Sequence, residues 1–199
     1  MEKISIIILA IVICVVIFIA STLVEGFFNR KWHKKTMQNF SFWYKGKLFW
    51  YSRSVAVTLF TFCKNEANQW CVLANLRGSG TPDFQNHWNV PCGYLDFNET
   101  GEEASKREVF EETNVNVPLD NISLLETDTS PKLNRQNVSL RYCATLDGLI
   151  TDYPLSKANM EKNEVDDIKW IPIDSIDNYK WAFGHLNDIK RIARKLEIG

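Results

Sequence analysis

The chain of 199 residues lacks the cysteine and histidine patterns of the disulfides or zinc sites that stabilise small proteins without a large hydrophobic core. Its five cysteines include no CxxC pair, and none of its three histidines is spaced from them as a zinc ligand would be. Scattered thiols are typical of a reducing compartment, so neither a disulfide framework nor a zinc domain is expected. Internal repeats and low-complexity tracts are also absent, which excludes collagen-like and low-complexity scaffolds.

The chain also lacks an excess of positive charge, since its formal net charge is −1. Residues 1–35 carry five basic and two acidic side chains, so the remaining 164 residues carry a net charge of −4. Broad binding to nucleic acid requires a basic surface, and we therefore expect no DNA partner. With 45% hydrophobic residues, the composition is that of a globular protein, large enough for one core without disulfides.

A single long run without charge stands near the N-terminus. Residues 4–24 contain only three polar residues, and a helix of that length spans roughly 30 Å, the thickness of a bilayer's hydrocarbon core. Four cations follow the run in 27–35 and one precedes it, so the positive-inside rule places the rest of the chain in the cytoplasm. We expect 1–35 to be a single-pass membrane anchor with its basic flank. The alternative is a cleaved signal peptide, although the run is long for one and no clean cleavage site follows.

Residues 36–199 show no further domain boundary and predict one mixed α/β domain. Their first stretch, 36–50, is rich in aromatic residues, which suits either packing at a membrane surface or the start of the fold. An amphipathic helix is expected over 185–198, where apolar residues recur at helical spacing. Runs rich in β-branched and aromatic residues predict strands at 54–63, 69–76, 122–127, 136–146 and 165–173.

A second helix is predicted over 101–113. Thr100, followed three residues later by Glu103, forms a capping box at its start. Asn114 stands past its end, and asparagine is the next best residue to glycine for the left-handed conformation there.

This helix carries three acids on one face, because Glu108, Glu111 and Glu112 are spaced by three and four residues. Like charges at that spacing repel one another, and Arg107 can pair with only one or two of them. Two interpretations are open from charge alone. The acids form either a solvated helix face or a site for a hard divalent cation, which takes oxygen ligands.

The spacing favours the second interpretation, because the segment resembles the Nudix box, G-x5-E-x7-R-E-U-x-E-E-x-G-U, where U is a bulky aliphatic residue. Six fixed and two apolar positions would match by chance at roughly 10⁻⁸ per start point. Asn114 departs from the pattern, standing where the family has glycine. The matching residues are Gly93, Glu99, Arg107, Glu108, Val109, Glu111, Glu112 and Val115.

The flanking segments resemble the same family more loosely. HWNVPCGYLD (87–96) is similar to the family's W-x-x-P-G-G run, with Cys92 in place of the first glycine. We expect that cysteine to be a packing residue rather than a nucleophile. EVDDIKWIPID (164–174) resembles the late strand whose acidic residue completes the metal site, which makes Glu164 a candidate outer ligand.

The resemblance implies an α/β/α sandwich with a mixed sheet and hydrolysis of a nucleoside diphosphate linked to another group. It implies Mg²⁺, or Mn²⁺, as the cofactor, because metal ions neutralise the phosphate charge and lower the pKa of bound water. Glu108 is the first candidate for the general base, oriented by Arg107, and Glu111 is the second. Glu99 is expected to pair with a helix cation or to reach a metal through water. The implied metal ligands are Glu108, Glu111, Glu112, the backbone carbonyl of Gly93, and Glu164.

Substrate contacts are less well defined by the sequence. Arg135 and Arg141 are candidates for phosphate contacts, with a solvated strand edge as the alternative, and Trp88 could stack on a base or lie in the core. Pro131 stands sixteen residues past Val115, a position typical of the ADP-ribose pyrophosphatase group. An ADP-ribose or nucleotide-sugar substrate is therefore favoured. A non-catalytic nucleotide sensor and an RNA 5′-end pyrophosphohydrolase are the alternatives, and the oligomeric state stays open, with a homodimer among the options.

Overall fold

The computed structural model describes residues 12–17, 40–130, 137–157 and 163–198. The chain divides into two compact units, Met1–Ser52 and Arg53–Gly199, and we refer to the second as the body. Within the described ranges, no helix has the length and apolarity needed to cross a bilayer. Most of the predicted anchor, 4–24, lies outside those ranges.

The described part of the first unit contains a short helical stretch at 12–17 and an antiparallel hairpin. Strand β1 (Phe40–Tyr44) pairs with β2 (Lys47–Tyr51) in a two-stranded sheet of its own. The turn consists of Lys45 and Gly46, with φ of +46° and +72°. Positive φ at both central residues matches the twist of the strands that a two-residue turn connects, which explains the tight hairpin.

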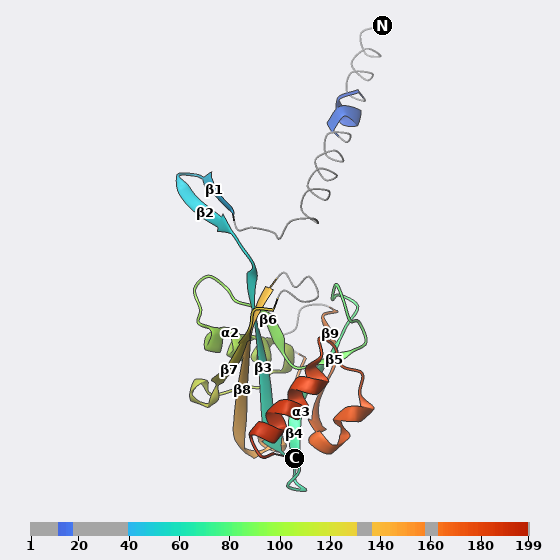
Figure 1. The fold of residues 1–199 in the computed structure, drawn as a ribbon. Coiled ribbons are helices and arrows are strands. Elements are labelled where there is room, and N and C mark those ends of the chain that lie inside the picture. The colour runs from blue at the N-terminus through green and yellow to red at the C-terminus, as the bar shows by residue number, and fades with distance from the viewer. Residues whose placement is uncertain (1–11, 18–39, 131–136, 158–162, 199) are drawn as a thin grey trace. The chain divides into compact units, whose positions relative to one another are not determined.

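The body contains one seven-stranded sheet (Figure 1). Its central strand β3 pairs in parallel with β8, whereas β4, β6 and the other paired strands run antiparallel to their neighbours, so the sheet is mixed as expected. The strand order is β5-β4-β3-β8-β7, with β6 also on β3 and β9 also on β4. The strands are β3 (Ser54–Lys64), β4 (Trp70–Arg77), β5 (Trp88–Asn89), β6 (Cys92–Tyr94), β7 (Ser123–Asp128), β8 (Asn137–Leu149) and β9 (Val165–Pro172).

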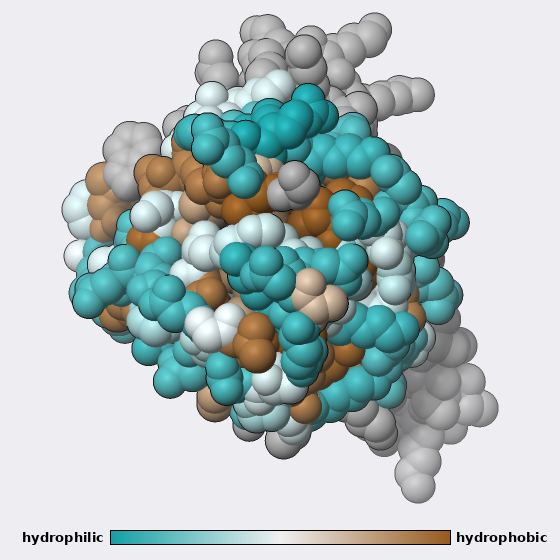
Figure 2. Space-filling model, turned by 90° about the horizontal axis from the view of Figure 1, so that it is seen from below, coloured by the Kyte–Doolittle hydropathy of each residue, from teal (hydrophilic) through white to brown (hydrophobic). Residues whose placement is uncertain are grey.

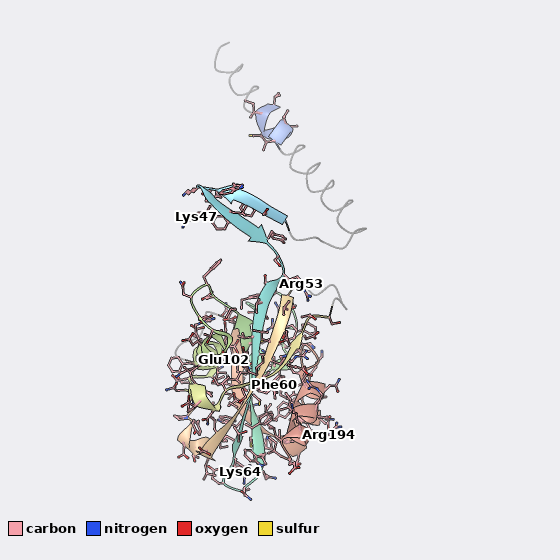
Figure 3. The ribbon with its side chains drawn as sticks, turned by 60° about the vertical axis from the view of Figure 1, so that its left-hand side comes forward. Lys47, Arg53, Phe60, Lys64, Glu102 and Arg194 are labelled. Atoms are coloured by element: carbon pink, nitrogen blue, oxygen red, sulfur yellow. The ribbon has the colours of Figure 1, made fainter. Side chains whose placement is uncertain are left out.

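Helices cover both faces of this sheet because successive side chains of a strand point to opposite faces. On β3, Phe60 and Phe62 pack with the core beneath α3 (His185–Lys195), and Phe60 lies near the middle of the body (Figure 3). Leu59 and Cys63 pack with the core beneath α2 (Gly101–Thr113). The α/β/α sandwich is therefore present. Short 3₁₀ turns lie at η1 (Leu119–Asn121), η3 (Ile150–Asp152) and η4 (Ile173–Asn178).

Helix α2 begins and ends where the sequence predicts. The Thr100 hydroxyl accepts a hydrogen bond from the Glu103 backbone N–H at 3.2 Å, and the Glu103 carboxylate accepts one from the Thr100 N–H at 2.7 Å. Asn114 has a φ of +66°, and its N–H donates to the Phe110 carbonyl. These caps satisfy backbone groups that a helix end otherwise leaves without partners, so they fix the position of the acidic face.

The structure differs from the sequence prediction in three places. Helix α3 ends at Lys195 rather than 198, because Glu197 adopts a φ of +55° that turns the chain back. Strands β5 and β6 have two and three residues, too few for an alternating pattern to show. The sequence also gave no indication that 40–51 forms a hairpin separate from the main sheet.

We expect Thr100→Ala to lower the free energy of unfolding by about 1 kcal/mol, since one helix N–H loses its partner. Thr100→Ser keeps the hydroxyl and is expected to lose much less. Urea unfolding of the full chain, followed by circular dichroism, measures both. Equal midpoints for the alanine and serine variants would show that the cap does not hold the helix.

Candidate functional site

Arg107 on α2 is the centre of an ion-pair network that joins the helix to the loop before it. Its Nε and Nη2 donate to the two oxygens of Glu99 at 3.0 and 2.7 Å, and Nη2 also donates to the Tyr94 carbonyl at 3.0 Å. Its Nη1 donates to Glu108 at 2.8 Å and to Glu111 at 3.0 Å. Glu99 thus pairs with a helix cation, the first of the two roles that the sequence allowed.

The two ends of this network differ in electrostatics. The hydrogen bonds from Arg107 hold the pKa of Glu99 below its usual range. Glu99 therefore stays ionised and keeps its ion pair with Arg107. Burial raises the pKa of Glu108 more than its hydrogen bond to Arg107 lowers it. Glu108 therefore accepts a proton more readily than an exposed glutamate does, which suits a general base.

Glu112 is the most unusual carboxylate of the cluster. It is buried, and its Oε2 has no hydrogen-bond partner among the residues that the structure describes. Burial, and after it the charges of Glu108 and Glu164, raise its pKa well above the usual value, while the Cys92 backbone and the positive charge of Arg77 oppose this only in part. Ionisation of this carboxyl group is therefore costly in the protein alone, and a cation beside its open oxygen would offset that cost.

Gly93 allows the loop to approach this cluster closely. Gly93 belongs to strand β6, which pairs with β3: Gly93 lies opposite Val57, and Cys92 lies opposite Thr58. A Cβ atom at residue 93 would overlap the Glu108 carboxylate. Glycine therefore leaves the space that the Glu108 carboxylate occupies beside the backbone of residue 93, and a larger residue there would displace that carboxylate.

The donor set fits Mg²⁺ or Mn²⁺, which bind carboxylate and carbonyl oxygens. Within the described residues, no three acidic, histidine or cysteine side chains are already gathered into a metal-binding group. Glu108 and Glu111 instead direct one oxygen each to Arg107. The open oxygen of Glu112 is the observation that fits a cation here, and Glu164 contributes negative charge to the same place.

Sequence reasoning missed Arg77, which ends β4 and acts on the same cluster. Its positive charge opposes the raised pKa of both Glu112 and Cys92, so it lies within electrostatic range of the site. Two hydrogen bonds to Asp83, at 3.1 and 2.7 Å, and the ring of Phe183, 4.7 Å away, hold the guanidinium in place. A basic residue at a strand end, directly before the loop RGSGTPDFQNH (77–87), was the available signal.

Cys92 behaves as a packing residue, as expected from the sequence. Burial, with the nearby charge of Glu112 as a second cause, raises the pKa of its thiol to about 12. Asn89 donates a hydrogen bond from Nδ2 to the sulfur at 3.4 Å. A thiol that stays protonated near neutral pH is a poor nucleophile, so Cys92 does not supply the reacting group.

Two of the three predicted substrate contacts, Trp88 and Arg141, have other partners in the structure. Trp88 is buried in the core on the α3 side, where its ring meets Tyr179 at 5.4 Å. The described ion pairs of Arg141 are with Glu126, Asp128 and Asp188, which tie β7 and β8 to α3. Arg135, like Pro131, lies outside the described residues.

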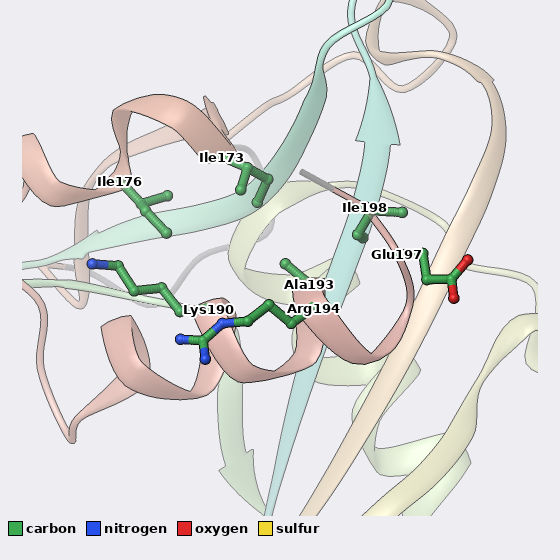
Figure 4. Close-up of a pocket in the computed structure, with 7 residues that line it drawn as sticks. All are labelled: Ile173, Ile176, Lys190, Ala193, Arg194, Glu197 and Ile198. Carbon is green, nitrogen blue, oxygen red and sulfur yellow. The ribbon is translucent and has the colours of Figure 1, made fainter.

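A pocket of about 510 Å³ lies elsewhere, between η4 and the end of α3 (Figure 4). Its floor includes Ile176 and Ile198, which belong to the core beneath α3. Since α2 packs on the opposite face of the sheet, this pocket is separate from the acidic cluster. It is lined by Ile173, Ile176, Lys190, Ala193, Arg194, Glu197 and Ile198.

Comparison with known proteins shows that the acidic residues of α2 lie within a known type of domain. Residues 52–191 match the family described as NUDIX domain. No curated protein matches the chain. Among solved structures, the NUDIX domain of Shewanella oneidensis NrtR complexed with ADP ribose aligns with a TM-score of 0.60 and 23% identity, covering 73% of this chain and 90% of that one.

Two further structures have the same fold. A bifunctional NMN adenylyltransferase/ADP ribose pyrophosphatase from Francisella tularensis, complexed with AMP and a Mn ion, aligns with a TM-score of 0.57 and 18% identity over 88% of this chain. A MutT/nudix family protein from Enterococcus faecalis aligns with a TM-score of 0.50 and 26% identity over 73%. The chain spans 47% of the first and 49% of the second, about half the length of each.

In buffer with EDTA, we expect Glu112→Gln to raise the unfolding temperature of the full chain by about 2–4 °C, the shift that ~1 kcal/mol produces in a domain of this size. The variant removes a buried charge that Glu108 and Glu164 repel. Added MgCl₂ should stabilise the wild type and not the variant. Thermal unfolding measures both effects.

Glu102→Gln is the matched control, because it removes a charge from the same helix outside the cluster. It is expected to leave the response to MgCl₂ unchanged. If Glu112→Gln destabilised the metal-free chain and still responded fully to MgCl₂, Glu112 would not be the residue that demands a cation.

Proposed function

The chain belongs to the Nudix family, and from that premise we propose that it is a Mg²⁺-dependent pyrophosphohydrolase of a nucleoside diphosphate linked to another group. The observation that carries the proposal is the buried Oε2 of Glu112, which has no hydrogen-bond partner among the described residues and feels the charges of Glu108 and Glu164. All the acids of the box are present, and one of them has a buried oxygen open to a cation.

Each side chain of the cluster has a separate task in this proposal. Glu112, Glu111 and Glu108 would hold the metal, together with the Gly93 carbonyl and Glu164. The bound metal would neutralise phosphate charge and lower the pKa of a water molecule. Arg107 orients Glu108, which takes the proton from the attacking water because burial raises its pKa. Glu111, exposed at the end of the network, is the second candidate for that proton transfer.

Arg77 extends this proposal to substrate binding. The guanidinium is fixed by Asp83 and Phe183 close to the carboxylates, and it is the positive group that opposes the charge of Glu112. An anionic phosphate beside the metal would meet this cation without further rearrangement of its side chain. Arg141 is engaged by three carboxylates and has no such task.

We propose an ADP-ribose or nucleotide-sugar substrate. Two similar structures are an NrtR domain complexed with ADP ribose and a protein with ADP ribose pyrophosphatase in its description, and Pro131 stands at the position typical of that group. These likenesses support a substrate class for the chain rather than one compound.

A nucleotide sensor is the second candidate, favoured by the likeness to NrtR, which has also been solved in complex with a 27mer DNA. The complete set of box acids supports the enzyme instead, since a sensor has no need of a general base. The net charge of −4 beyond residue 35 also speaks against a nucleic-acid partner for this chain, including the 5′ end of an RNA.

We further propose that residues 4–24 anchor the chain in a membrane and that the body faces the cytoplasm. The support is the uncharged length of that run and the four cations that follow it, against one before it. A domain boundary between this segment with its flank, 1–35, and the hydrolase domain, 36–199, belongs to the same proposal.

A substrate screen tests the activity directly. We expect the full chain with MgCl₂ to hydrolyse ADP-ribose or nucleotide sugars faster than NTPs or dinucleoside polyphosphates, with the phosphate products resolved by chromatography. MnCl₂ is expected to substitute, and EDTA to stop turnover. Binding of ADP-ribose without turnover of any compound would favour the sensor.

We expect Glu111→Gln and Glu112→Gln each to reduce kcat by about 10²–10⁴-fold while the fold is retained, because each removes a charge used for the metal or the proton. Glu102→Gln, on the same helix, should keep the wild-type rate. Steady-state kinetics measure the effect, and wild-type rates in both cluster variants would remove the assignment of the site.

Protease protection tests the orientation. Protease added outside intact cells is expected to spare the body, and digestion is expected only after the cells are opened. Cleavage of the body in intact cells would reverse the proposed topology.

A further inference from the structure

The hairpin β1–β2 exposes an unusual amount of aromatic surface. Of the side chains in its strands, Trp43 is 73% exposed, Tyr44 57% and Phe42 47%. Leu48, Phe49 and Tyr51 are also exposed. Contiguous apolar surface of this kind on a water-soluble protein marks an interaction site.

Both faces of the hairpin carry this surface. Phe42 lies opposite Phe49, with ring centroids 5.7 Å apart, and Tyr44 follows on the same face. Trp43 lies opposite Leu48 on the other face. An antiparallel sheet in water normally keeps one face polar, and a lone two-stranded hairpin is marginally stable there. We therefore expect both faces of the hairpin to contact a partner or medium that accepts apolar as well as polar groups.

The surface of the body differs. On the face drawn in Figure 2, hydrophilic residues break up the apolar ones into separate patches. Its large aromatic side chains at the core, such as Phe60 and Phe62, are fully buried. The body exposes single aromatic side chains, such as Phe97 and Tyr94, whereas in the hairpin several exposed ones lie side by side on two short paired strands.

The charge of the region selects the partner. Residues 26–65 contain eight lysines and arginines and no aspartate or glutamate, whereas the chain as a whole is slightly acidic. Two of these cations lie at the end of the hairpin, Lys45 within the turn and Lys47 directly after it, where Figure 3 labels Lys47. Aromatic rings beside lysines are the combination found at membrane–water interfaces, where the rings lie among headgroups and the ammonium groups meet phosphates.

The chain length brings the hairpin to such a surface. Fifteen residues, 25–39, separate the apolar run from β1, and fifteen residues reach at most about 50 Å. A segment tethered so closely to a bilayer has a high effective concentration at its surface.

We propose that the hairpin β1–β2 is a second membrane contact, which inserts its aromatic side chains into the headgroup region of an anionic bilayer. This inference extends the proposed anchoring by 4–24 but rests on the hairpin's own side chains. A second copy of the chain fits less well as the occupant, because two hairpins would bring Lys45 and Lys47 of each into like-charge contact.

The test uses the full chain labelled with 5-fluorotryptophan and reconstituted with vesicles of phosphatidylcholine and phosphatidylglycerol. The ¹⁹F resonance of Trp43 is identified by its loss in Trp43→Phe. A lipid spin-labelled near its headgroup is expected to relax this resonance several-fold faster than that of Trp70, which packs against the core of the body and serves as the control. Vesicles of phosphatidylcholine alone should give a smaller effect.

Two other results would overturn the proposal. Trp43 relaxed by a water-soluble paramagnetic chelate, and not by the labelled lipid, would place the hairpin in water. Trp43 protected from both reagents would place it in a contact with protein, either the body or a second copy. Sedimentation of the chain with vesicles after alkaline extraction reports the anchor separately, so failure of the anchor and failure of the hairpin contact are distinguishable.

Discussion

The hydrogen bonds of one guanidinium, that of Arg107, hold the site of this protein together. Its donors join the loop, through Glu99 and Tyr94, to the helix that carries Glu108 and Glu111. The pair with Glu99 is bidentate, a geometry that fixes direction as well as distance. Backbone hydrogen bonds of β6 and of Leu95 to β3 also hold the loop, but the pair with Glu99 joins it by side chains to α2. Without Arg107, the carboxylates of Glu108 and Glu111 would repel one another with no cation between them.

The carboxylates that stabilise the site differ from the carboxylate that is open to a cation. Glu99 has a lowered pKa and is fully paired, whereas Glu112 has a raised pKa and an oxygen left open. Burial raises the pKa of Glu108 as well, so the unfavourable electrostatics lie at Glu108 and Glu112, whereas Glu99 is stabilised as an anion. Local strain of this kind is retained where a ligand relieves it, and a divalent cation is the ligand that a set of carboxylates selects.

Local patterns predicted much of this correctly. The capping box at Thr100, the left-handed Asn114 and the acidic face of α2 depend on neighbours within one or two turns, so the sequence reveals them. Arg77 could not be found in this way, because its approach to Glu112 depends on how β4 lies beside the box. The engagement of Arg141 by Asp188 likewise joins residues 47 positions apart, and no local rule predicts such a pair. The hairpin was missed for another reason, since its aromatic residues fit a core strand as well as an exposed one.

The parallel pairing of β3 with β8 has a consequence for synthesis of the chain. Ser54 pairs with Asn137, so the central ladder of the sheet cannot begin to form until 83 further residues have been made. At about 5–20 residues per second on the ribosome, the apolar strand β3 waits on the order of 4–17 s for its partner. During that interval β4 can form a hairpin with β3, but the other edge of β3 stays open to aggregation or to chaperones. The strand order therefore leaves one edge of β3 unpaired during synthesis, and a chaperone that binds this edge would prevent aggregation of the nascent chain.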